Sequence, residues 1–181
     1  MLLDGDDIRR LLSELGDELD SGGVRGELFI VGGAAMALAY NTRRSTRDID
    51  AVFEPKTIVY EAAGRVADRH PDLPPDWVND AVKGFLLGDD PAATVMFDHP
   101  GLRVRVASPR YLFVMKVAAS RVERDTDDIV ALHRLSGFGG AEDALAYVAR
   151  TYPHLVLAPR VRYLLEELDA SHLLGPGHPA P

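Results

Sequence analysis

One short stretch constrains the fold of this chain more than any other. Residues 27–31 form an apolar run typical of a buried strand, and Gly32 and Gly33 end it with a sharp turn. The apolar residues 34–40 then predict a buried helix, and residues 49–53 predict a second strand. A strand, a glycine turn, a helix and another strand in this order indicate a mixed α/β fold.

The second strand opens with two acids separated by one residue. Strand side chains alternate between faces, so Asp48 and Asp50 should point the same way while Ile49 enters the core. Two adjacent carboxylates repel each other, and Mg²⁺ relieves that repulsion by binding one or two carboxylates together with substrate phosphates. The backbone N–H groups at Gly32 and Gly33 begin a helix, where a phosphate can bind. This arrangement favours nucleotidyl transfer.

These residues, with a second block further along, resemble the polymerase-beta-type nucleotidyltransferase superfamily. The closer likeness is to the AbiEii and MenT toxin group of small bacterial nucleotidyltransferases. Their Gly-Gly-x-Ala turn, apolar helix and Asp-Ile-Asp pair are matched by residues 32–40 and 44–50. The second block comprises residues 109–116, which lead into residues 124–129. The ordered combination is more specific than either motif alone.

The resemblance implies a site and a chemistry. It implies Mg²⁺ ligands at Asp48 and Asp50, with the use of two ions possible: one holds the β- and γ-phosphates of an NTP, and the other lowers the pKa of the attacking hydroxyl. The implied catalytic residues are Asp48, Asp50, Lys116 and Asp128. Among the expected nucleotide-binding residues, the resemblance implies Lys116. Gly32 and Gly33 are expected from their backbone N–H groups, and Arg44 and Arg47 from their position beside the acid pair.

The implied function is transfer of an NMP from an NTP to the tRNA 3′ end, by the toxin of a bacterial toxin–antitoxin pair with a cognate antitoxin protein as partner. Two alternatives stay open. The acceptor could be a small molecule such as an antibiotic, or the chain could be a catalytically inactive module that binds nucleotide or a regulatory partner.

Each site residue also has a purely structural interpretation. The glycines could only permit a turn, and Lys116 could extend from the edge of an apolar helix towards solvent. Asp125 and Asp128 have the spacing of a capping arrangement at a helix start. Asp48 and Asp50 could be solvated acids at a strand edge, paired with nearby arginines.

The chain departs from the pattern of the resembling family at two places. Ala34 stands where relatives often carry Ser or Thr, whose hydroxyl contacts the nucleotide phosphate. The third carboxylate of the superfamily is also missing from the strand predicted at 102–107, which carries Arg103 and Arg105 instead. Asp98 is the nearest acid, and a turn is the simpler explanation for it.

The remaining pattern predicts an α+β chain in which residues 1–108 form a mixed-sheet core and residues 109–170 form a helical lobe. A catalytic cleft is expected between them, and residues 171–181 are expected to be a disordered tail. Further helices are predicted at 6–19, 57–68, 109–122, 126–136, 141–151 and 159–169, a hairpin at 92–97 and 102–107, and mostly loop at 71–91.

Composition narrows the class of protein. The formal net charge of −8 argues against a protein that coats nucleic acid, although a local basic patch can still bind RNA. The absence of cysteine excludes disulfides and thiolate metal sites, and fits a cytoplasmic location.

Arginine outnumbers lysine by 17 to 3, which is typical of GC-rich bacterial coding. No apolar run is long enough for a membrane span, and no secretory signal is expected at residues 1–7.

Overall fold

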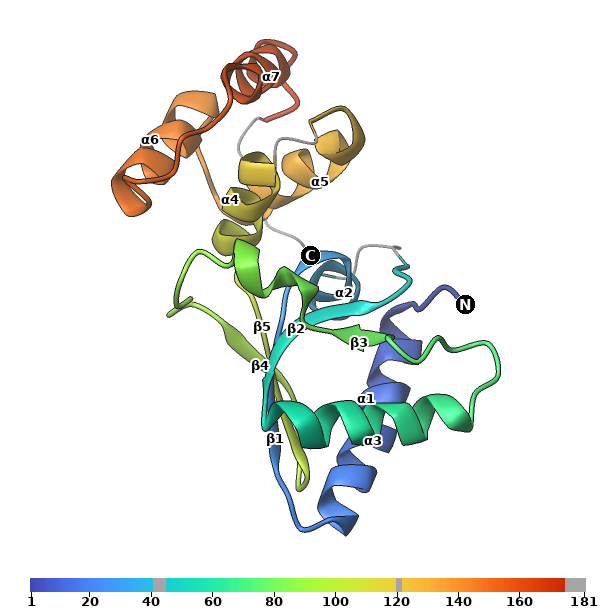
Figure 1. Ribbon diagram of the computed structural model, residues 1–181. Coiled ribbons are helices and arrows are strands. Elements are labelled where there is room, and N and C mark those ends of the chain that lie inside the picture. The colour runs from blue at the N-terminus through green and yellow to red at the C-terminus, as the bar shows by residue number, and fades with distance from the viewer. Residues whose placement is uncertain (41–44, 120–121, 175–181) are drawn as a thin grey trace. The chain divides into compact units, whose positions relative to one another are not determined.

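The computed structural model describes residues 1–40, 45–119 and 122–174, with the side chains of residues 122–124 excepted. The chain divides into two compact units. The first contains Met1–Leu86 and Asp90–Ala107, and the second contains Leu87–Asp89 and the chain from Ser108 onward. Figure 1 shows the strands, which belong to the first unit, and the helices α4 to α7, which belong to the second.

The first unit is built on a mixed sheet. Its strands lie in the order β3-β2-β1-β5-β4, with β1 antiparallel to β2 and parallel to β5. The elements are α1 Gly5–Ser21, β1 Gly26–Ile30, α2 Gly32–Ala39, β2 Ile49–Glu54, α3 Lys56–Asp68, β3 Val78–Asn79, the 3₁₀ helix η1 Ala81–Phe85, β4 Thr94–His99 and β5 Leu102–Val106. The predicted fold class, a mixed-sheet core followed by helices, is confirmed.

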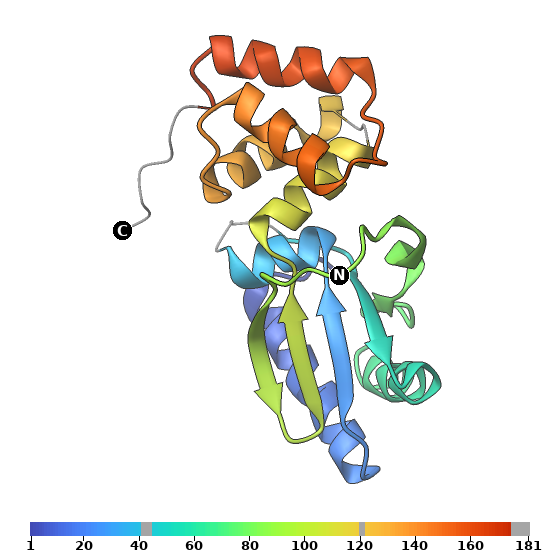
Figure 2. The same ribbon diagram turned by 90° about the vertical axis from the view of Figure 1, so that its left-hand side faces the viewer.

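One face of this sheet is covered by helices of the same unit. Alternate strand residues such as Leu28, Ile49 and Val104 are at most 2% exposed, and α1 and α3 pack against each other and against the strands. The apolar stripe of α1 supplies much of this core, and Asp4 caps the helix by accepting hydrogen bonds from the N–H groups that follow it. In Figure 2 the strands lie in front of α1, and their other face is turned towards the viewer.

The segment predicted as mostly loop, residues 71–91, contains two short elements. β3 pairs in parallel with β2, so that Ile49 lies beside Val78 and Asp50 beside Asn79. Trp77 precedes β3, is fully buried, and donates its indole N–H to the carbonyl of Ala63 at 3.0 Å. A strand of two residues is too short to show alternation, so the sequence pattern could not reveal it.

The second unit is helical. It contains α4 Pro109–Ala119, α5 Val122–Leu135, α6 Ala141–Thr151 and α7 Pro159–Ala170. These bounds agree with the predicted helices within a few residues, and the largest difference is the earlier start of α5 at Val122. Of the predicted tail, Leu174 is fully buried, whereas residues 175–181 lie outside the described part. Among the described residues no helix is both long and apolar enough to cross a membrane.

Candidate active site

The glycine turn sits against the acid pair. Gly32 begins α2 with a φ of +64°, a left-handed conformation that costs little only for glycine. A Cβ atom on Gly32 would lie 3.2 Å from Oδ2 of Asp50, and one on Gly33 would lie 3.0 Å from Oγ1 of Thr46. The two glycines therefore allow the N-terminus of α2 to approach the loop that carries the acids. The turn has a structural role whether or not phosphate binds there.

Thr46 fixes that loop from the other side. Its hydroxyl donates a hydrogen bond to the carbonyl of Asp48 at 3.1 Å. Its backbone forms an isolated antiparallel bridge with Leu3, which is fully buried. The chain entering β2 is therefore held at three points: by the Leu3 bridge, by the Thr46 hydroxyl and by the glycine turn.

Asp48 and Asp50 are both half-buried, and Ile49 between them is fully buried, as the alternation predicted. Asp50 lies on β2, and Asp48 immediately precedes it. The side-chain amide of Asn79 donates a hydrogen bond to Oδ2 of Asp48 at 3.2 Å. The two acids are thus partly packed within the fold and are not fully exposed at a strand edge.

The environment of Asp50 disfavours its charged form. Burial, and then the negative charge of Asp48, raise the pKa of the Asp50 carboxyl above its ordinary value, while hydrogen bonding from Asn79 acts in the opposite direction. A cation between the acids would remove the repulsion, and this is the electrostatic condition expected of a metal-binding pair.

The donor set fits Mg²⁺. Mg²⁺ prefers oxygen ligands and binds to proteins through one or two carboxylates while retaining water or phosphate oxygens. Asp48 and Asp50 supply two carboxylates, and Gly32 leaves the Asp50 oxygen uncrowded because it has no Cβ. No group of three or more acidic, histidine or cysteine side chains with the arrangement of a metal site occurs among the described residues. Phosphate and water would have to supply the other ligands.

The strand on which the superfamily's third acid was expected carries no acid. Arg105 lies on β5, and the nearest candidate acid, Asp98, lies on β4 and forms an ion pair with Arg25. Asp98 is in register with Arg103, near the start of β5, whereas the acid pair lies beside the end of β1. Asp98 is therefore at the opposite end of the sheet and does not serve as a third ligand of this site.

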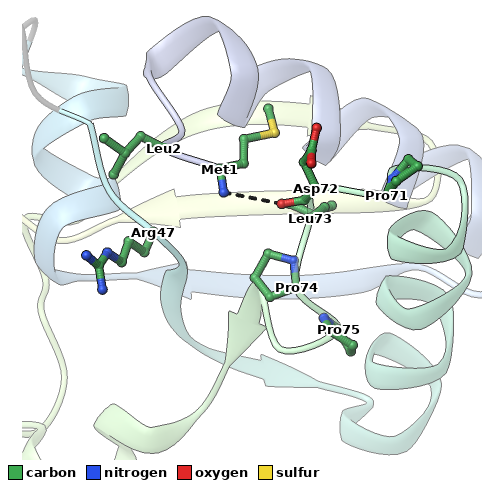
Figure 3. A pocket seen from close by; sticks show the side chains of 8 residues that line it. All are labelled: Met1, Leu2, Arg47, Pro71, Asp72, Leu73, Pro74 and Pro75. Atoms are coloured by element: carbon green, nitrogen blue, oxygen red, sulfur yellow. Dashed lines mark hydrogen bonds between the residues drawn. The ribbon is translucent and has the colours of Figure 1, made fainter.

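Arg47 lies beside Asp48 and borders an open hollow of about 730 Å³. Figure 3 shows that Met1 and the prolines at 71, 74 and 75 line the other side, and that the guanidinium of Arg47 points away from these prolines. This orientation of Arg47 does not identify the hollow as a phosphate site. The predicted nucleotide-binding role of Arg47 stays a prediction, and Arg44 lies outside the described residues.

Lys116 belongs to a compact ionic cluster in the second unit. Its ammonium lies 3.0 Å from Oδ1 of Asp125 and 2.9 Å from Oδ2 of Asp128. The three side chains are only 22%, 11% and 9% exposed, so Lys116 does not simply extend towards solvent. Because α5 begins at Val122, the two aspartates lie one turn apart inside the helix, and the capping interpretation is wrong.

The sequence motifs did not reveal the supporting residues. Asn79 and Thr46 both contact Asp48. Thr46 lies within the matched residues 44–50, although that motif assigns no role to it, and Asn79 lies outside both matched blocks. Thr46 could have been suspected from its position in the loop before the pair. Asn79 has no such signal, because only the pairing of β3 with β2 brings it to the site.

Together the mixed sheet, the glycine turn into α2 and the acid pair at the start of β2 define a nucleotidyltransferase-like chain. A family described as nucleotidyltransferase of unknown function (DUF6036) matches residues 7–135, and the chain belongs to this family. The matched residues include the glycine turn, the acid pair, Lys116 and Asp128.

Among solved structures, the chain is similar to an antigenic nucleotidyltransferase-like protein from Paracoccidioides brasiliensis. The two are 16% identical over 98% of this chain and 97% of that chain, with a TM-score of 0.42. Among curated proteins no relative matches. The closer likeness to the AbiEii and MenT toxins stays a prediction, as does the cleft between the two units.

Proposed function

We propose that this protein is a Mg²⁺-dependent nucleotidyltransferase that transfers an NMP from an NTP to an acceptor hydroxyl. The observation that carries the proposal is the acid pair: two half-buried carboxylates, one with a raised pKa, held beside a glycine turn at a helix N-terminus. Membership of a nucleotidyltransferase family supports the same chemistry.

In this proposal Asp48 and Asp50 hold the metal, and Asn79 keeps the Asp48 carboxylate in one orientation. Bound Mg²⁺ would neutralise phosphate charge and make the acceptor hydroxyl a better nucleophile. The N–H groups at the start of α2 are donors for phosphate oxygens. Ala34 offers no hydroxyl, so these backbone donors matter more here than in relatives with Ser or Thr.

The reaction is an in-line displacement. The acceptor oxygen forms a bond to the α-phosphorus of the NTP, the bond from that phosphorus to the bridging oxygen of the β-phosphate breaks, and pyrophosphate leaves. The hydroxyl proton passes to solvent. No covalent intermediate with the protein is needed, so the protein contributes mainly by positioning and charge stabilisation.

We further propose the tRNA 3′ end as acceptor and a toxin role, with an antitoxin protein as partner. Support for this finer assignment is the resemblance of the two sequence blocks to the AbiEii and MenT group. It predicts that expression in a bacterial host arrests growth, that Asp50→Asn removes the arrest, and that a neighbouring antitoxin gene relieves it.

One alternative has structural support. Ala34, the arginine in place of a third acid, and the pairing of Lys116 with two carboxylates all favour a module that binds nucleotide without turnover. Such a module would bind NTP and Mg²⁺ but transfer nothing. A small-molecule acceptor, by contrast, would give turnover without labelled RNA.

The deciding experiment incubates the protein with Mg²⁺, total tRNA and each NTP in turn, labelled at the α-phosphate. Wild type should label the RNA, and Asp48→Asn and Asp50→Asn should not. Asp98→Asn is the matched control, because it removes an acid from the same sheet but at its other end. NTP labelled at the γ-phosphate should leave the RNA unlabelled. Nucleotide binding without transfer by wild type would contradict the proposal.

A further inference from the structure

The sheet face opposite α1 carries two cross-strand rows of different chemistry. The row far from the acid pair consists of Glu54, Glu27, Arg103 and Asp98 on neighbouring strands. Arg103 thus has an acid beside it on each side, and Asp98 also pairs with Arg25. Cross-strand pairs of opposite charge stabilise a sheet, so Arg103 has a structural role in balancing these acids.

The row next to the acid pair carries no acid. Its members are Val52, Phe29, Arg105 and Val95, again aligned across the strands. Val52 follows Asp50 by two residues on β2, so the row and the Asp50 side chain share one face of the sheet. Arg105 and Val95 are exposed, and Phe29 and Val52 are half-buried.

Arg105 is held by an aromatic ring. Its guanidinium lies over the ring of Phe29, 5.8 Å from the centroid. It forms no ion pair with any residue that the structure describes, in contrast to Arg25, which precedes β1 and pairs with Asp98. A guanidinium is planar and carries several N–H donors, so Arg105 in this position can offer a surface for a base and donors for a phosphate.

Its distance from the acids suits a polymeric acceptor. Arg105 is two strands away from β2 and about two residues further along, which corresponds to about 10 Å across and about 7 Å along the sheet. A group bound at Arg105 is too far from the acid pair to be the reacting hydroxyl. It is close enough to belong to a neighbouring nucleotide of the same nucleic-acid chain.

We infer that Phe29 and Arg105 form a stacking platform for the single-stranded end of a nucleic-acid acceptor. One base stacks on the guanidinium plane, Arg105 contacts its phosphate, and Phe29 positions Arg105. This inference rests on the proposed function, because it assigns the acceptor class of the same site. It also explains how a chain of net charge −8 can bind RNA through one local cation rather than a broad basic surface.

The test measures RNA binding separately from catalysis. A 5′-fluorescent single-stranded RNA of roughly eight nucleotides with a free 3′ hydroxyl is titrated with the full chain, and anisotropy gives the Kd. Arg105→Ala should raise the Kd by about ten-fold or more and lower the salt dependence of log Kd by about 0.7. Arg105→Lys keeps the charge but not the guanidinium plane, and Phe29→Leu keeps Arg105 but not the ring that positions it. Both variants should therefore fall between Arg105→Ala and wild type.

Arg103→Ala is the matched control, since it removes another exposed arginine from the same strand and should change the Kd less than Arg105→Ala does. NTP binding should be unchanged in every variant. Equal effects at 103 and 105, or a wild-type Kd in Arg105→Ala, would overturn the inference even if wild type transfers label. Loss of tight RNA binding in Arg105→Ala together with an inactive wild type would support the platform while refuting the proposed transferase.

Discussion

The side chain of Asn79 is fixed at both ends. Its amide N–H donates to Oδ2 of Asp48 at 3.2 Å, and its carbonyl accepts from the N–H of Ala81 at 3.1 Å. The pairing of β3 with β2 places it beside Asp50 in register. This short edge strand therefore orients a candidate metal ligand as well as extending the sheet.

Asn79→Asp should lower turnover by about ten-fold, because the loss of one hydrogen bond to a carboxylate is worth about 1.5 kcal/mol. The aspartate can still accept from Ala81, so the turn is retained while a like charge faces Asp48. Label transfer and thermal melting measure the two effects. Asn79→Ala loses the turn contact as well, and wild-type rates in both variants would show that Asp48 needs no such restraint.

The raised pKa of Asp50 makes the free energy of unfolding depend on pH in a definite direction. Because burial and the charge of Asp48 raise the folded-state pKa above the ordinary 3.8, the folded protein binds this proton more tightly than the unfolded chain. The resulting stabilisation is complete below the unfolded-state pKa and is lost as the pH rises through the folded-state pKa. Asp50→Asn should therefore gain stability relative to wild type as the pH rises from below 3.8 towards neutrality.

Melting temperatures measured across that pH range without metal check this expectation, with Asp98→Asn as the control. Mg²⁺ should reverse the order at neutral pH, since a ligand at a hundred-fold excess over its Kd stabilises by about 2.7 kcal/mol and only wild type keeps both acids. A pH-independent difference between Asp50→Asn and wild type would mean that the carboxyl does not titrate in this way.

Much of the fold was predictable because its signals are local. The stripe of α1, the glycines that begin α2 and the alternation around Ile49 each specify an element from a few adjacent residues. The acid pair was recognisable for the same reason, since strand alternation alone places both side chains on one face.

The parts that could not be predicted depend on contacts between distant segments. Asn79 meets Asp48 only through a strand of two residues, and Arg105 meets Phe29 only through the parallel pairing of β5 with β1. The spacing of Asp125 and Asp128 suggested a helix cap. That prediction was wrong because α5 begins at Val122, several residues earlier than the sequence pattern indicated. Local periodicity carries no information about such pairings.

Gly32 should be intolerant of a side chain for two separable reasons. Gly32→Ala places a Cβ at φ +64° and 3.2 Å from Oδ2 of Asp50. The backbone strain alone should cost about 1–2 kcal/mol of unfolding free energy. Gly23→Ala is the matched control, because it has a φ of +68° with nothing within 4 Å of its added Cβ.

Both variants should lose similar stability in denaturant unfolding, but only Gly32→Ala should also weaken the stabilisation by Mg²⁺. Equal Mg²⁺ responses in Gly32→Ala and wild type would show that the turn serves folding alone and does not shape the metal site.

The ionic cluster around Lys116 allows its structural and functional roles to be separated. Lys116→Met leaves two poorly exposed carboxylates one helical turn apart without their cation, and should destabilise the protein by about 1–3 kcal/mol, reduced from the fully buried case by partial exposure. Lys83→Met removes an exposed lysine and should change stability by less than about 0.5 kcal/mol. Denaturant unfolding measures both values.

If Lys116 also contacts NTP phosphates, it uses the donor that remains, since an ammonium has three N–H groups and two face Asp125 and Asp128. Asp125→Asn should then maintain or strengthen NTP binding, because it removes a competing negative charge while Asp128 still holds the lysine. Lys116→Met should weaken NTP binding by at least ten-fold, and Lys116→Arg should restore it only in part. Equal weakening by Asp125→Asn and Lys116→Met, or wild-type affinity in Lys116→Met, would assign the cluster to the folding of the helical unit alone.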